Sequence, residues 1–402
     1  MSGERQHWVL PQEPFPSWEF FALFPKLVRK HGSEAGPSQF FWARNAIYHA
    51  LGALKISTSA HVLLPAYLCR AAVEPFVAYG TEVEFYGIER NCQPDFAEIE
   101  SKISPRTEAI LAVHYFGFPQ EIRRFREICD RRHLALIEDC AHVLRGKIAE
   151  TPLGGYGDAS VFSWRKFVPI YDGSDLRLGK PHRLPQIGWQ KESRAFTLKI
   201  AKNLADRTLD NSPHPLARTA ASAAESAKRI WKGLRPARSN DALVSLDSND
   251  PSFDREWVNQ PMSRLSRWLF RHSSIDAIVR RRRENYLYLE SLLRTVKGVT
   301  PLHQSLPAGV CPWVFPVFFD DLPNAHFLLR RLGIPATAWD FVRPLQVDLG
   351  CFSNAAFLYE NLTFLPIHQN LTRKSLDLLA AAVQQVRQLG EIHDRGKVYV
   401  GA

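Results

Sequence analysis

The chain has 402 residues, of which 45% are hydrophobic and 23% charged, which is the make-up of a globular protein of about two or three domains. It has no apolar run of about 18 residues and no basic region followed by an apolar stretch at its start, so we expect neither a membrane-spanning helix nor a secretory signal. None of its six cysteines forms a C-x-x-C pair, which argues against a zinc or other metal site and favours reduced thiols in a cytoplasmic protein.

The formal net charge of +10 is concentrated in one stretch of the chain. Between Lys180 and Asn240 there are thirteen Lys or Arg residues against four Asp or Glu residues. The stretch has no aromatic residues at stacking spacing and no nucleic-acid-binding motif, so we expect a solvated basic face and not a nucleic-acid site. Peripheral contact with an anionic membrane through residues 180–258 remains an alternative.

Residues 1–38 are rich in aromatic residues and proline, and we expect them to form an arm that packs on the rest of the protein. From there to Leu178 the pattern predicts strands and helices in alternation. The predicted strands are His61–Tyr67, Glu82–Ile88, Ala109–Tyr115, Leu134–Glu138 and Ala159–Trp164, and the predicted helices are Arg44–Leu54, Phe96–Lys102 and Gln120–Arg132. Such alternation is typical of a mostly parallel sheet with helices on both faces.

The regular alternation stops after Leu178, where a basic insertion over residues 180–258 begins. It comprises a basic amphipathic segment, an alanine-rich segment and a polar linker, at Arg194–Leu209, Leu216–Trp231 and Ser239–Asp254. We expect a large domain over 39–273 that includes this insertion, and a small α+β domain over 274–402. The small domain is predicted to contain a linking helix, a strand and two further helices, at Ser274–Val296, Trp313–Phe319, Asn324–Leu332 and Leu376–Leu389.

Two of the predicted strands end in residues that carry chemistry. The apolar run from Leu134 leads directly into Glu138 and Asp139, and the next strand is followed by Arg165 and Lys166. Ligands of open α/β sheets bind beyond the carboxyl ends of the strands. A lysine that forms a Schiff base and an acid that keeps a pyridinium nitrogen charged are what a pyridoxal phosphate enzyme requires. We therefore expect pyridoxal 5'-phosphate as the cofactor.

Five motifs occur in the order and spacing of one family. They are L-P-A-Y (64–67), V-H-Y-F-G-F-P (113–119), L-I-E-D-C-A-H (136–142), V-F-S-W-R-K (161–166) and L-P-I-H-Q-N-L-T (365–372). On these residues the chain resembles the DegT-type sugar aminotransferases, which are pyridoxal phosphate enzymes of the aspartate aminotransferase fold, type I. The resemblance implies an α/β fold with a large, mostly parallel-sheet domain and a small C-terminal α+β domain.

The resemblance also implies roles for particular residues. Lys166 is the implied Schiff-base lysine, although many family members have two more residues before it, and Asp139 the implied partner of the pyridine nitrogen. His142 lies where the family has Gln or His near the phenolic oxygen of the cofactor, and Ser163 matches a serine that binds the phosphate.

A helix N-terminus would complete the phosphate site. The family usually has S-G-T there, whereas this chain has Trp42-Ala43-Arg44-Asn45. The resemblance then implies that Arg44 and Asn45 contribute to phosphate binding, through the charge of Arg44 and the backbone amides of both. Cys69 occupies the position at which the family commonly stacks an aromatic residue on the cofactor ring.

The function implied is transamination of a keto-sugar, nucleotide-linked, with an amino acid such as glutamate as donor, in polysaccharide or glycoconjugate biosynthesis. The resemblance also implies a homodimer. Two alternatives stay open. One is a pyridoxal phosphate-dependent sugar dehydratase, although the family's dehydratases replace the lysine with His. The other is a catalytically degenerate binding or regulatory protein, suggested by the altered phosphate turn.

Overall fold

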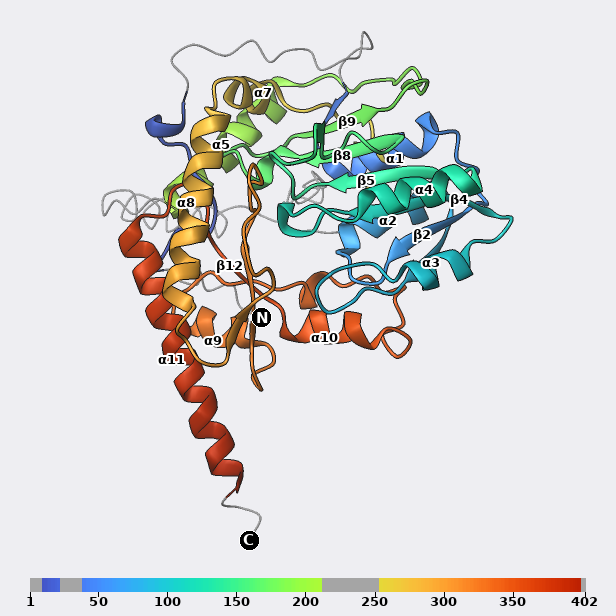
Figure 1. The fold of residues 1–402 in the computed structure, drawn as a ribbon. Helices are drawn as coiled ribbons and strands as arrows, with labels where there is room; N and C mark the ends of the chain where they lie inside the picture. Colours follow the sequence, from blue (N-terminus) through green and yellow to red (C-terminus); the bar gives the residue numbers. More distant parts are fainter. Residues whose placement is uncertain (1–8, 22–37, 212–252, 399–402) are drawn as a thin grey trace, which may run out of the picture.

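The computed structural model describes residues 9–21, 38–211 and 253–398. A seven-stranded sheet lies at its centre (Figure 1). In order across the sheet the strands are β1 (Gln39–Phe40), β9 (Ser174–Leu178), β8 (Ala159–Ser163), β5 (Ala135–Cys140), β4 (Thr107–Val113), β2 (His61–Pro65) and β3 (Glu82–Tyr86). The five strands from β8 to β3 run parallel to one another, and β9 and β1 are antiparallel to their neighbours. The prediction of a mostly parallel sheet is confirmed.

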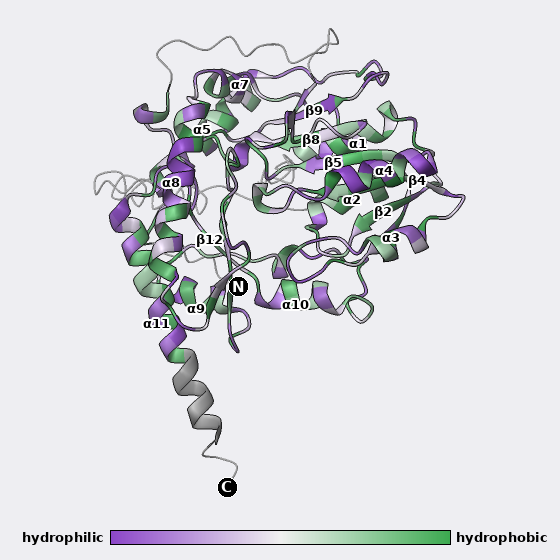
Figure 2. Ribbon diagram, in the orientation of Figure 1, coloured by the Kyte–Doolittle hydropathy of each residue, from purple (hydrophilic) through white to green (hydrophobic). Residues whose placement is uncertain are grey.

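The central strands are apolar runs that are buried along nearly their whole length, as expected for parallel strands covered on both faces. The helices that connect them are α1 (Ala43–Ala53), α2 (Arg70–Tyr79), α3 (Phe96–Lys102) and α4 (Ile122–Arg132). In α4 the residues Ile122, Phe125 and Cys129 are buried, so one face packs on the sheet. Figure 2 shows the hydrophilic residues of the same helix beside the hydrophobic ones.

Several strands end a few residues from the predicted position, and two of these differences concern the site described below. The strand predicted to end at Glu138 continues to Cys140, because Asp139 and Cys140 pair with Val161 and Phe162 of β8. The strand predicted to include Trp164 ends at Ser163.

Residues Trp164–Lys166 form a 3-10 turn after β8. The N–H of Trp164 donates to the carbonyl of Gly173, and the carbonyl of Trp164 accepts from Phe167. The chain then returns along the sheet as β9, a strand that the sequence did not predict. Gly173 has φ +136° at this return, and a Cβ there would lie 2.7 Å from the Cε of Met262. Only glycine fits both conditions without strain.

A second sheet of three antiparallel strands lies in the C-terminal part. Its strands are β10 (Val299–Pro301), β11 (Phe315–Phe319) and β12 (Thr363–Leu365), and the helices around it are α8 (Ile275–Leu293), α9 (Ala325–Arg331), α10 (Ser353–Asn361) and α11 (Arg373–Val398). The predicted long helix corresponds to α8, and the last predicted helix begins three residues earlier than expected and extends farther. Helices α8 and α11 lie side by side (Figure 1).

The basic insertion is described in part. Its amphipathic segment forms α5 (Arg194–Asn211), and α7 (Arg264–Arg271) follows the insertion. Phe196 and Ile200 of α5 pack in a cluster with Phe41 and Trp42 at the start of α1. The alanine-rich segment and nearly all of the polar linker lie outside the described residues. A short hairpin, β6 (Lys147–Ile148) with β7 (Thr151–Pro152), completes the strands.

Residues 9–21 cross from the C-terminal part to α5. The N–H of Val9 donates to Gly333, the backbone of Phe15 exchanges two hydrogen bonds with the side chain of Asn370, and the N–H groups of Gln12 and Glu13 donate to Asn211 on α5. This part of the predicted arm therefore packs on the rest of the protein. Within the described ranges, no helix is long and apolar enough to cross a membrane.

Candidate active site

Strands β5 and β8 are neighbours in the sheet, so their carboxyl ends bring Asp139 and the turn that carries Lys166 together. The two side chains act on each other electrostatically: the negative charge of Asp139 raises the pKa of Lys166, and the positive charge of Lys166 lowers the pKa of Asp139. Asp139 and Lys166 therefore lie near each other at the carboxyl ends of two neighbouring strands, and this is the edge at which open α/β sheets generally bind ligands.

The amine of Lys166 gives up its proton more readily than the amine of an exposed lysine. Desolvation lowers its pKa from 10.5 to about 8, an effect that Asp139 opposes and the neighbouring Arg165 reinforces. Its Nζ atom lies 4.7 Å from the ring centroid of Trp313, which comes from the C-terminal part of the chain. A lysine with this pKa is mostly protonated at pH 7, but it holds more free amine, the form that attacks a carbonyl carbon, than an ordinary lysine does.

Asp139 is buried, with 7% of its surface exposed. Burial raises its pKa, and the charge of Lys166 and the N–H of Ala141, which donates to Oδ1 at 2.8 Å, act in the opposite direction. The carboxylate is therefore held in one orientation beside a basic group. It suits the recognition of a protonated ring nitrogen.

His142 lies three residues beyond Asp139, in a stack of aromatic rings. Its ring is 4.1 Å from that of Trp313 and 5.9 Å from that of Phe116, with interplanar angles of 15° and 6°. Burial and the charge of Lys166 lower the pKa of His142 well below 6.5, so the ring is neutral. Nδ1 accepts the N–H of Phe116 at 3.2 Å, which leaves the proton on Nε2 as a donor.

The remaining three predicted site residues are near the first turn of α1 and the end of β8. Ser163 is buried at the last position of β8, where it pairs with Ser174. Arg44 is buried with its guanidinium carbon 3.9 Å from the Trp42 ring centroid. Asn45 donates from Nδ2 to the carbonyl of Trp257 at 2.5 Å. The side chain of Asn45 is thus engaged with the segment after the insertion, and no contact in the described structure joins it to Lys166 or Asp139.

Two further residues lie near the amine of Lys166. Cys69, which the sequence analysis had singled out, is the residue before α2, and its thiol lies within electrostatic reach of both Lys166 and Asp139. Burial raises the pKa of this thiol. Trp313 was predicted only as the start of a strand, and nothing in the local sequence connects it with Lys166, because the contact joins segments 147 residues apart.

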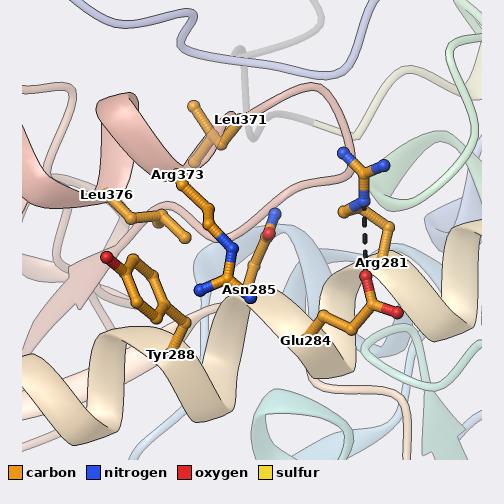
Figure 3. Close-up of a pocket in the computed structure, with 7 residues that line it drawn as sticks. All are labelled: Arg281, Glu284, Asn285, Tyr288, Leu371, Arg373 and Leu376. Atoms are coloured by element: carbon orange, nitrogen blue, oxygen red, sulfur yellow. Dashed lines mark ion pairs between the residues drawn. The ribbon is translucent and has the colours of Figure 1, made fainter.

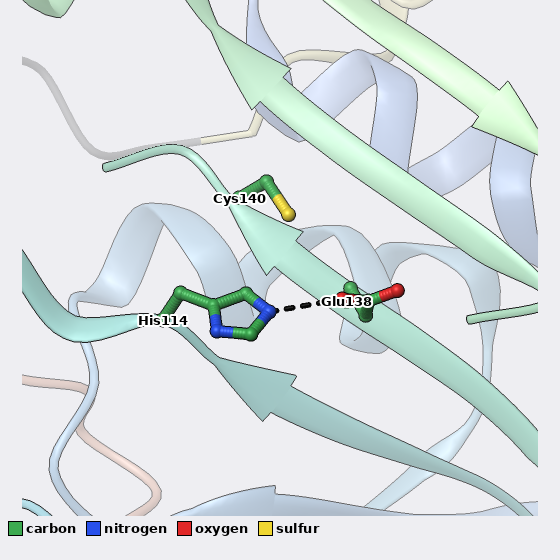
Figure 4. A group of neighbouring side chains, drawn as sticks. All are labelled: His114, Glu138 and Cys140. Carbon is green, nitrogen blue, oxygen red and sulfur yellow. Dashed lines mark hydrogen bonds and ion pairs between the residues drawn. The ribbon is translucent and has the colours of Figure 1, made fainter. Parts of the chain in front are cut away.

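Glu138, next to Asp139, has a different role. Its carboxylate accepts N–H groups of Gly154, Tyr156 and Gly157 at 3.0, 2.7 and 2.5 Å, and the ring of His114 at 2.9 Å. His114, Glu138 and Cys140 lie close enough together to be considered as metal ligands (Figure 4).

Both ring nitrogens of His114 are already used, however, because Nδ1 accepts the N–H of Gln120. Hydrogen bonds therefore account for this cluster without an ion. It anchors the 154–157 loop to the strand that carries Asp139.

A cavity of about 260 Å³ lies between α8 and the start of α11, and is lined by Arg281, Tyr288 and Arg373 among others (Figure 3). None of the six site residues predicted from the sequence lines it. The cavity is therefore separate from the cluster at the ends of β5 and β8.

The site residues at the ends of β5 and β8 lie in a part of the chain that matches the model of one protein family. Residues 43–170 match the model of the DegT/DnrJ/EryC1/StrS aminotransferase family. All six site residues predicted from the sequence lie within this range.

Two curated relatives match over similar stretches. The GDP-perosamine synthase of Vibrio cholerae is 33% identical over 167 residues, which are 39% of this chain and 46% of that protein. The dTDP-4-dehydro-2,3,6-trideoxy-D-glucose 4-aminotransferase of Saccharopolyspora spinosa is 28% identical over 150 residues, which are 36% of this chain and 39% of that protein. The matched stretches thus span less than half of each relative.

The likeness to solved structures extends over nearly the whole chain. Helicobacter pylori PseC, an aminotransferase involved in the biosynthesis of pseudoaminic acid, superposes with a TM-score of 0.62 at 16% identity, covering 95% of this chain and 99% of that chain. At this identity the likeness concerns the fold. The large mostly parallel sheet and the small C-terminal sheet are those of the type I fold of pyridoxal phosphate-dependent transferases, as expected from the sequence.

Proposed function

We propose that this protein is a pyridoxal phosphate-dependent aminotransferase that acts on a nucleotide-linked keto-sugar, because residues 43–170 match the model of the DegT/DnrJ/EryC1/StrS aminotransferase family. The observation that carries the proposal is the pair at the ends of β5 and β8. A lysine amine with a pKa of about 8 lies beside a buried carboxylate inside the matched segment. This is the pair that the cofactor's aldehyde and its ring nitrogen require.

The substrate class is supported by the relatives. Their names describe aminotransferases or synthases of GDP- and dTDP-linked sugars. We propose that an amino acid, glutamate in the first instance, supplies the amino group, and that the product enters polysaccharide or other glycoconjugate biosynthesis.

The residues of the site fit the cofactor. When bound, pyridoxal phosphate supplies an electron-withdrawing ring that stabilises negative charge at the adjacent substrate carbon. Asp139 would face the ring nitrogen and keep it protonated. Lys166 would hold the cofactor, and its Nζ, once released, would carry a proton to and from the substrate carbon. The neutral His142 would donate from Nε2 to the phenolic oxygen.

The phosphate would lie between the end of β8 and the start of α1. Ser163 offers a hydroxyl there, and Arg44 offers the backbone N–H of the first helical turn, whereas the N–H of Asn45 already donates to the carbonyl of Trp42 at 3.1 Å. Helix α1 begins at Ala43, and Trp42 before it provides no side-chain cap, so the N–H groups of Ala43 and Arg44 can donate to an anion. The charge of Arg44 would add to their attraction.

We further propose that the working unit is a homodimer in the cytoplasm, and that the chain divides into an arm over 1–38, a cofactor domain over 39–273 and a small domain over 274–402. The change of sheet after α8 supports the last boundary. Sedimentation analysis with and without the cofactor tests the dimer.

The test of the activity is an absorption spectrum of the protein titrated with pyridoxal phosphate. We expect a visible band that borohydride traps on Lys166, as read by peptide mass spectrometry, and that glutamate bleaches. Lys166→Ala should lack the band, whereas the exposed Lys147→Ala should keep it.

The two alternatives have different outcomes. A protein that gives the trapped band but turns over a keto-sugar without incorporating nitrogen from glutamate would be a dehydratase. A wild-type protein that gives no band would be a binding or regulatory module, and the proposal would fall.

A further inference from the structure

Helix α8 carries a buried arginine on the face that packs against the rest of the protein. The buried residues of this helix are Ile278, Val279, Arg282, Asn285, Tyr286, Leu289 and Leu293. Such a stripe normally takes apolar side chains. Arg282 lies in it with 1% of its surface exposed. A cation at such a position needs a structural or functional reason.

The guanidinium of Arg282 donates to three separate parts of the chain. Nη2 donates to the carbonyl of Lys166 at 3.2 Å, Nη1 to the carbonyl of Trp313 at 2.9 Å, and Nε to Oε1 of Gln369 at 3.0 Å. The guanidinium carbon also lies 4.9 Å from the ring centroid of Phe167. A planar fork of donors can hold three acceptors in fixed directions, which a lysine ammonium cannot.

Among the described residues, no carboxylate pairs with Arg282. Desolvation lowers its pKa to about 10, which still leaves the group charged at neutral pH. A buried cation without a counter-ion is less stable than a packed apolar side chain of similar size. The cost of burying this cation points to a role for its three hydrogen bonds, which hold three segments of the chain in place.

The three hydrogen bonds hold the backbone around the contact between Lys166 and Trp313. Lys166 and Trp313 present their carbonyls to Arg282, while the Nζ of the lysine lies 4.7 Å from the ring centroid of the tryptophan. Gln369 extends the same network, because its Nε2 donates to the carbonyl of Phe167 at 2.8 Å. One guanidinium therefore fixes the backbone on both sides of this contact.

We infer that Arg282 is a positioning residue for Lys166, which holds the amine against Trp313 in the desolvated space beside Asp139. The inference rests on the proposed function in so far as Lys166 is the reactive amine. Arg282 acts through the backbone, because it is not among the ionisable groups that shift the pKa of Lys166, which are Cys69, Asp139 and Arg165.

The inference is tested on the protein without cofactor, in the variant Arg282→Met. Lys166 is acetylated with a trace of acetic anhydride across a pH series, and its pKa is read from the labelled peptide by mass spectrometry. Loss of the anchor lets the turn relax and water reach Nζ, so we expect the pKa of Lys166 to rise from about 8 by roughly one or more. An unchanged pKa in a folded Arg282→Met protein overturns the inference.

The matched control is Arg280→Met, on the exposed face of the same helix, which should leave the pKa of Lys166 unchanged. Two milder variants serve if Arg282→Met does not fold. Arg282→Lys keeps the charge but not the fork, and Gln369→Ala removes one partner while Arg282 stays. Both should raise the pKa of Lys166 by less than Arg282→Met, and a wild-type value in both rejects the inference.

The labelling separates this inference from the proposed function. It needs no cofactor, so a wild-type protein that fails to give the visible band counts against the proposed function and leaves the labelling result intact. A wild-type protein that gives the band, with a Lys166 pKa that is insensitive to Arg282, counts against the inference alone.

Discussion

At the scale of single residues, the site combines groups whose ordinary ionisation is altered by their neighbours. The pKa of Lys166 is lowered and that of Asp139 is raised, in both cases chiefly by desolvation. Groups of this kind reduce the stability of the fold, because a charged or chargeable side chain has been moved out of water. Such perturbed groups cluster at sites where chemistry is done.

The instability due to Lys166 is measurable. The pKa of Lys166 is about 8 in the folded state, and the ordinary value for a lysine is 10.5, so below pH 8 both the folded and the unfolded state hold the proton and the fold bears the full cost of burying the charge. Between pH 8 and 10.5 the unfolded state holds more protons, and the Lys166 contribution to stability rises with pH. Lys166→Met should therefore raise the free energy of unfolding of the cofactor-free protein by about 1–3 kcal/mol at pH 7.

Urea unfolding at pH 7 and pH 10 checks this prediction. The gain of Lys166→Met over the wild type should shrink at the higher pH, whereas Lys147→Met, at an exposed site, should gain nothing at either pH. A Lys166→Met protein less stable than the wild type at pH 7 would contradict it.

At the scale of elements, two neighbouring residues at the carboxyl end of β5 have different roles, because successive side chains of a strand point to opposite faces of the sheet. Asp139 is directed to the reactive side, and Glu138 to the loop before β8. Burial alone would raise the pKa of Glu138, but His114 and the N–H groups of Gly157 and Gly154 outweigh burial and lower it below 4.5. Glu138 therefore holds the loop, and with it the relative position of β5 and β8.

Glu138→Gln should destabilise the fold. The amide cannot accept all the hydrogen bonds of the carboxylate, and buried donors are left without partners, at a cost of about 2–4 kcal/mol. Because the folded pKa of Glu138 is lowered, its contribution is present above pH 4.5 and is lost as the pH falls through the folded value.

Thermal unfolding at pH 7 and pH 4 measures the effect of Glu138→Gln. The difference from the wild type should narrow at the lower pH. Glu150→Gln, in the exposed hairpin turn, is the control and should change nothing. A difference that stays constant with pH would mean that the charge of Glu138 is not what holds the loop.

At the scale of the whole molecule, residues 9–21 join parts that are far apart in the sequence. Glu13 forms an ion pair with Arg207 of α5, and its charge also acts on Arg165, the neighbour of Lys166. Asn211 accepts the N–H groups of Gln12 and Glu13 at 2.7 and 2.9 Å. This segment thus links α5, the lysine turn and the C-terminal part.

Asn211→Ala should loosen the segment without unfolding the protein. It removes the acceptor of two backbone N–H groups, worth about 1 kcal/mol each, so amide exchange of Gln12 and Glu13 should be about fivefold or more faster. Hydrogen exchange with mass spectrometry reads this, and Asn203→Ala on the same helix is the matched control. Exchange at wild-type rates would show that other contacts hold the segment.

The sequence alone determined the strand–helix alternation, the parallel sheet and the placement of Asp139 and Lys166 near the carboxyl ends of two strands, because these depend on apolar periodicity and on residues close together in the chain. It did not determine the 3-10 turn at Lys166, where the N–H of Trp164 donates to Gly173, or the strand β9, which depends on pairing with β8 and β1. Only the tertiary structure brought the ring of Trp313 next to the amine of Lys166 and the guanidinium of Arg282 to the carbonyls of both residues. The contacts with Lys166 join residues more than a hundred positions apart, and their energies come from burial and packing that exist only once the chain has folded.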